Sequence, residues 1–128
     1  MVRPSMRPLL LFVPLLTISS LLACSSGSGV SGSAPMSTLN PGDYAKVCKF
    51  YNDKSQALVG QTCMASQQVV MQILRIDCTT NPFTGTMCPA TVSDVEACAS
   101  NTDACSALPG GKRPAECVKV AQCLGGGS

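Results

Sequence analysis

The hydrophobic pattern of the chain changes twice, from an apolar N-terminal stretch to a Gly/Ser-rich one and then to apolar residues at helical spacing. The first charged residues are Arg3 and Arg7, and an uncharged stretch follows them as far as Cys24. A basic segment followed by an apolar one is typical of an export signal. The alternative is a membrane-spanning helix, which needs about 20 apolar residues. Because residues 9–22 number 14 and include Pro14, the pattern favours the export signal.

The first two predicted helices lie in the middle of the chain. Asn40, Pro41 and Asp43 supply an N-cap, a Pro at the first helical position and an acidic first turn, and apolar residues then recur at steps of three and four until Gly60. A second helix is predicted over residues 62–77, where apolar residues again share one broad face. The same segment is rich in Val and Ile, which keeps a β-strand open as the alternative.

The third predicted helix has two overlapping capping motifs at its start. Thr91 with Asp94, and Ser93 with Glu96, both match the pattern in which a hydroxyl residue is followed three positions later by an acid. Apolar residues then continue at helical spacing, so a helix is expected from this point.

Two long loops and a fourth helix complete the pattern. Residues 79–89 and 101–113 are rich in Pro, Gly and Asn and predict loops. Pro114 starts the fourth helix, and Gly125 ends it. The predicted fold class is therefore a small all-α, disulfide-rich fold of about four short helices with two long loops.

The cysteines support this class. The chain has 9 Cys and no His or Trp. An even set in a small exported domain predicts a disulfide framework, which supplements a modest core. Eight cysteines allow roughly 100 pairings, and the sequence does not choose among them. The set without Cys24 is Cys48, Cys63, Cys78, Cys88, Cys98, Cys105, Cys117 and Cys123.

A metal site is the alternative use of these cysteines. Structural zinc sites usually pair Cys ligands about two to four residues apart, often together with His. Here the closest cysteine pairs are 6 and 7 residues apart and His is absent. The sequence therefore predicts disulfides, and neither a metal nor another cofactor.

The segment Leu21-Leu22-Ala23-Cys24 resembles the lipobox of bacterial lipoproteins. In that family the Cys sulfur receives a diacylglyceryl group, and a peptidase then cuts before the Cys, whose amino group is usually acylated as well. The resemblance implies removal of residues 1–23 and a membrane anchor of acyl chains such as palmitate on Cys24. Ser25 after the Cys then implies sorting to the outer membrane, on its periplasmic or surface face. The alternative is an ordinary signal peptide with a chance Cys near its cleavage site.

A second resemblance covers about a third of the chain. The segments from Val92 to Cys98 and from Pro114 to Cys117 are similar to parts of small Cys-rich lipoproteins of the myxobacterial type. Such proteins mostly have no assigned function, so the resemblance implies a location rather than an activity.

The domain organisation follows from these segments. Residues 1–23 are the signal peptide and residues 24–38 the lipidated Cys with a flexible Gly/Ser-rich tether. Residues 39–124 form the disulfide-stapled helical domain, and residues 125–128 are a flexible tail. The G-x-G-x-x-G match at residues 27–32 is interpreted as tether, because a phosphate-binding loop has to follow a strand and open a helix.

Charge and chemistry exclude several function classes. Without Arg3 and Arg7, the 9 Lys and Arg become 7, which equals the 7 Asp and Glu. A net charge of zero gives no footprint for nucleic acid. Without His, no Ser-His-Asp or Cys-His arrangement can form.

The leading functional hypothesis is a lipid-anchored, non-catalytic cell-envelope protein that presents its small domain to an envelope protein partner. The alternative is a module that binds a small apolar ligand or lipid between its helices, with Met64, Met71, Ile73 and Leu74 as candidate lining. These residues equally suit a filled core, since Met commonly fills packing gaps. A hydrolytic enzyme that uses paired carboxylates is the third hypothesis.

Overall fold

The longest element is the helix α1 (Pro41–Gln56), in a computed structural model that describes residues 27–125. It follows a single 3-10 turn, η1 (Met36–Thr38). The Asn40 side chain accepts a hydrogen bond of 2.8 Å from the backbone N–H of Asp43, which satisfies one of the free donors at the start of α1. The first predicted helix is thus confirmed, and it ends before Gly60, whose φ of 87° suits glycine in the following turn.

The second predicted helix, over residues 62–77, is wrong. The chain instead forms a short antiparallel hairpin of β1 (Thr62–Cys63) and β2 (Gln68–Val69), with Thr62 opposite Val69. Gln67 closes the hairpin turn with a φ of 59°, a left-handed conformation that a helix does not contain. The prediction of a small, disulfide-rich fold built mainly from helices is confirmed. The prediction that it is all-α is wrong, because the fold also contains a two-stranded sheet.

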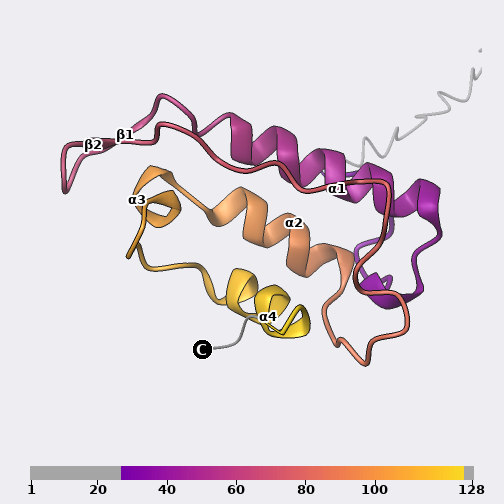
Figure 1. Cartoon of the computed structure of the whole chain (residues 1–128). Helices are drawn as coiled ribbons and strands as arrows, with labels where there is room; N and C mark the ends of the chain where they lie inside the picture. The colour runs from indigo at the N-terminus through magenta and orange to yellow at the C-terminus, as the bar shows by residue number, and fades with distance from the viewer. Residues whose placement is uncertain (1–26, 126–128) are drawn as a thin grey trace, which may run out of the picture.

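After the hairpin, residues 70–78 return in an extended conformation along α1 (Figure 1). The Asn52 side chain receives a hydrogen bond of 2.8 Å from the backbone N–H of Ile76 and donates one of 2.9 Å to its carbonyl. Gln56 donates a bond of 2.9 Å to the carbonyl of Ile73. These side chains of α1 take up backbone groups that a helix would have bonded internally, which explains why the segment stays extended.

The C-terminal half contains α2 (Val92–Asn101), α3 (Ala104–Ala107) and α4 (Ala115–Cys123). Thr91 and Asp94 form a capping box at the start of α2, as predicted, whereas Glu96 instead accepts hydrogen bonds from Ser28. The loop prediction for residues 101–113 missed α3. Asp103 caps this short helix by accepting a bond of 2.8 Å from the N–H of Ser106.

The three long helices lie in one layered arrangement, with α2 packed against both α1 and α4 (Figure 1). All eight predicted cysteines pair, as Cys48–Cys78, Cys63–Cys105, Cys88–Cys123 and Cys98–Cys117. Every bridge joins segments that are distant in the sequence, so each one fixes packing between elements rather than a local turn.

The segment predicted as a flexible tether, residues 24–38, overlaps the folded part. Within it, Met36 is only 1% exposed and belongs to the core. The N–H of Val92 bonds the carbonyl of Ala34 at 2.9 Å, and the N–H of Ser93 bonds that of Gly32 at 2.9 Å. These bonds satisfy backbone N–H groups at the start of α2 that have no partner within the helix. The Gly/Ser-rich segment is therefore held on the domain here and is not a flexible tether. Cys24 and the predicted signal peptide lie outside the described residues.

Candidate functional site

A cavity of about 350 Å³ lies between the helices, and we call it the central cavity. Helix α1 contributes Tyr44, Val47 and Tyr51 to its wall, α2 contributes Val95, and α4 contributes Val120, with other apolar residues between them. Each of these positions follows from the helical spacing that turns one face of each helix inward. Tyr44, Val47 and Val95 are 3%, 0% and 6% exposed and belong to the packed core. The open apolar space therefore lies beside this core, against half-buried residues such as Tyr51 and Val120.

The hydroxyl groups around the central cavity are largely satisfied by the protein itself. Tyr44 donates to the carbonyl of Asp77 at 3.4 Å, and Thr102 donates to that of Cys98 at 2.7 Å. Ser106 donates to the carboxylate of Asp103 at 2.9 Å. Burial, and then the charge of Asp77, raise the pKa of Tyr44, so this phenol is neutral at physiological pH. Tyr51 and Ser55 bring two further hydroxyls to the wall, so the polar groups that the cavity offers a ligand are few and mostly uncharged.

Among residues 27–125, Arg113 is the one charged residue that lines the central cavity. It lies in the loop before α4 and is exposed. No ion pair of Arg113 occurs among residues 27–125. Leu124, at the end of α4, also lines the cavity while being 51% exposed. Ile76 and Pro82 are exposed lining residues too, so Arg113 and Leu124 mark one of the places where the cavity meets solvent.

The lining predicted from the sequence is mostly wrong. Of the four candidates, only Ile73 lines the central cavity. Met64, Met71 and Leu74 are 75%, 81% and 86% exposed on the hairpin and the extended segment. The sequence predicts these residues on a helix over residues 62–77, and this helix does not form. The actual lining could have been sought on α1, where Tyr44, Val47 and Tyr51 recur at helical spacing.

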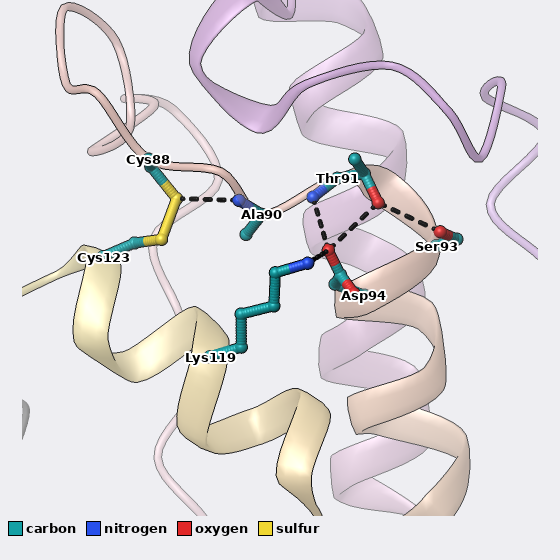
Figure 2. Close-up of polar contacts among 7 residues, drawn as sticks. All are labelled: Cys88, Ala90, Thr91, Ser93, Asp94, Lys119 and Cys123. Atoms are coloured by element: carbon teal, nitrogen blue, oxygen red, sulfur yellow. Dashed lines mark hydrogen bonds and ion pairs between the residues drawn. A yellow bond between two sulfur atoms is a disulfide. The ribbon is translucent and has the colours of Figure 1, made fainter.

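Lys119 of α4 contacts Asp94, which also bonds Thr91 at the start of α2, and we call these three residues the polar joint (Figure 2). The Asp94 carboxylate accepts a bond of 2.8 Å from the N–H of Thr91 and lies 2.7 Å from the Lys119 ammonium. The hydrogen bond from Lys119, followed by that from Thr91, lowers the pKa of Asp94 below its usual range. The nearby Cys88–Cys123 disulfide ties the end of α4 to the loop before α2. The joint fixes one wall of the central cavity.

The carboxylates considered as catalytic groups lie away from the central cavity. In the described part of the chain, no Asp or Glu lines the central cavity. Asp94 and Asp103 accept hydrogen bonds at the starts of α2 and α3, and the Asp43 carboxylate accepts one from the side chain of Asn40, the cap of α1. Within residues 27–125 no group of three metal-ligating side chains comes together. The same residues contain no helix that is long and apolar enough to cross a membrane.

These features define a small, disulfide-rich, helical protein with an apolar cavity that opens to solvent. Its four disulfides indicate an oxidising compartment, as for an exported protein. Comparison with protein-family models, with curated proteins and with solved structures gives no match.

Proposed function

We propose that this protein is a lipid-anchored, non-catalytic module of the cell envelope that holds a small apolar molecule in its central cavity. The observation that carries the proposal is the cavity itself. Its volume of about 350 Å³ lies at the lower end of the roughly 300–1,000 Å³ that small-molecule sites span. A bound apolar molecule would cover apolar side chains of this pocket and thereby stabilise the fold.

The anchor is supported by the lipobox-like segment ending at Cys24 and by the pairing of all the other cysteines. A cysteine left over from a complete disulfide set is free for another modification. Burying acyl chains contributes about 0.8 kcal/mol per CH₂, so two or three chains hold a protein permanently on a membrane.

The test of ligand binding uses N-phenyl-1-naphthylamine, a neutral apolar dye whose fluorescence rises in an apolar site. The purified oxidised protein should bind the dye with one saturable site. Ala121→Phe should abolish this binding, because Ala121 lines the central cavity and a ring there occupies it. Ala115→Phe is the matched control, since Ala115 lies exposed on the same helix. If the wild type does not bind, or if both variants bind equally, the cavity is not a binding site.

Contact with an envelope protein is the second candidate function, and the hairpin arm (residues 59–76) favours it. Large apolar side chains of this arm lie exposed, and they are Val59, Met64, Val69, Met71, Leu74 and Ile76. Exposed apolar patches often mark protein-binding surfaces. In cross-linking on intact cells, a Met71→Ser, Leu74→Ser variant should lose a discrete cross-linked partner while its dye binding stays unchanged. A cross-link pattern identical to that of the wild type would argue against this role of the arm.

A further inference from the structure

The central cavity combines an apolar interior with a cation at its solvent side. Arg113 lines the cavity and is exposed, whereas the wall behind it consists mainly of apolar side chains from α1, α2 and α4. Of the hydroxyl side chains in the wall, those of Tyr44, Thr102 and Ser106 donate to protein acceptors. The other two, Tyr51 and Ser55, carry no charge. The guanidinium is therefore the strongest donor left for a ligand.

The charged neighbours of Arg113 do not neutralise it. Among residues 27–125, the ion pairs are Asp43–Lys46, Asp53–Lys49 and Asp94–Lys119. Glu116 is close in sequence, on the first turn of α4, but forms no ion pair with Arg113 in this part of the chain. A guanidinium without a carboxylate partner beside an apolar space suits an anion that arrives with the ligand.

We propose that the central cavity takes a single-chain amphiphile with an anionic head group, whose chain fills the cavity and whose head group meets Arg113. This inference rests on the proposed binding function and adds the chemical class of the ligand. A volume of about 350 Å³ corresponds to roughly a dozen water-sized groups at about 30 Å³ each, which suits a chain of about ten carbons.

The position of Arg113 at the solvent side is what makes an anion acceptable there. A carboxylate or phosphate drawn into an apolar interior without a partner would lose its hydration at a high cost. At Arg113 the head group keeps part of its hydration and gains charge-assisted, bidentate hydrogen bonds. The apolar chain alone then enters the cavity, where burial is favourable.

The test compares three ligands of equal chain length: decanoate, decyl phosphate and 1-decanol. Each displaces N-phenyl-1-naphthylamine from the purified oxidised protein at low ionic strength. We expect at least one of the two anions to bind about 5- to 10-fold more tightly than the alcohol, as for a partly exposed charged contact. Which of the two anions binds more tightly tells a carboxylate head group from a phosphate one.

Arg113→Gln should remove this preference and leave decanol binding unchanged, whereas Lys112→Gln, next to it but not in the cavity wall, should keep it. The preference of the wild type should also shrink in high salt. If decanol binds as tightly as both anions, or if Arg113→Gln keeps the preference, the inference is overturned while the binding function stands. If neither the dye nor any of the three ligands binds, the proposed function itself fails.

Discussion

Gly111 has less room than any ordinary side chain needs. A Cβ atom at this position would clash with the carbonyl oxygen of Cys105 and would lie 3.0 Å from those of Ser106 and Leu108. All three are backbone atoms of the α3 region, so they cannot move aside without shifting the helix. Glycine here lets the chain turn closely past α3 before it reaches Arg113.

We therefore expect Gly111→Ala to lower the free energy of unfolding by at least about 1–3 kcal/mol, the usual cost of overpacking. Thermal unfolding of the oxidised protein measures the effect. Gly42→Ala is the control, because its Cβ would lie 3.4 Å from the side chain of Asn40, an ordinary contact, inside α1. Its melting temperature should be unchanged or slightly higher. Equal melting of Gly111→Ala and the wild type would contradict this account of the turn.

At the scale of elements, the joint between α2 and α4 gives a pH dependence. The folded protein lowers the pKa of Asp94, mainly through Lys119. Unfolded Asp titrates near about 3.9. The joint therefore contributes its full stability above about pH 4, and this contribution is lost as the pH falls through the lower folded pKa. The Lys119 side chain is 43% exposed, so screening limits the contribution to about 0.5–1 kcal/mol.

Denaturant unfolding as a function of pH measures this contribution. Asp94→Asn should be less stable than the wild type at pH 7, and the difference should shrink below about pH 4. Glu116→Gln removes one carboxylate from α4 without touching the joint. It should follow the wild type at each pH. A constant difference between Asp94→Asn and the wild type down to pH 2 would show that the ionised joint does not stabilise the fold.

The Cys63–Cys105 bridge is the covalent link between the hairpin and α3. Replacing both cysteines with Ser should lower the free energy of unfolding by about 2–4 kcal/mol. The loss should be local as well, because the hairpin contributes few buried residues. Hydrogen exchange should therefore speed up at the amides of Gly60 and Val70, which donate to the carbonyls of Val70 and Gln61 at the base of the hairpin, while α2 stays protected. Unchanged exchange at Gly60 and Val70 would show that the hairpin holds its place without the bridge.

The elements differ in how far the sequence could predict them. Helices α1 and α2 begin at caps made by neighbouring residues, Asn40 with Asp43 and Thr91 with Asp94. Such signals are local and could be recognised. The extended segment is held by Asn52 and Gln56, which are distant in sequence, and the spacing of its apolar residues happened to match a helix as well. Here tertiary contacts decide between two locally possible conformations.

The central cavity could be predicted only in part. The inward face of α1, with Tyr44 and Val47, follows from its helical period. Whether facing side chains fill the space between three helices depends on how the disulfides place those helices, and the sequence allowed many pairings. Arg113 comes from a loop whose course is set by the close turn at Gly111. For this reason no local pattern marked it as part of a site.

At the scale of the whole molecule, the folded part begins close to the proposed anchor. The Ser28 N–H bonds the Glu96 carboxylate at 2.7 Å. The four residue steps from Cys24 to Ser28 span at most about 14 Å when fully extended. If Cys24 carries the lipid, the domain is thus held near the membrane surface, because the flexible part is shorter than the tether of residues 24–38 that the Gly/Ser composition suggested. A ligand that is itself an amphiphile could reach the central cavity from that membrane.

The anchor is tested by the mass and the partitioning of the exported protein. We expect the mature form to lack residues 1–23, to carry acyl chains on Cys24 and to weigh eight hydrogens less than its reduced chain because four bridges form. It should enter the detergent phase of Triton X-114, since buried acyl chains dominate its partitioning. Cys24→Ala should stay in the aqueous phase or remain unprocessed, with the same deficit of eight hydrogens showing that its domain is intact. If Cys24→Ala is processed and still enters the detergent phase like the wild type, the membrane attachment has another origin than Cys24.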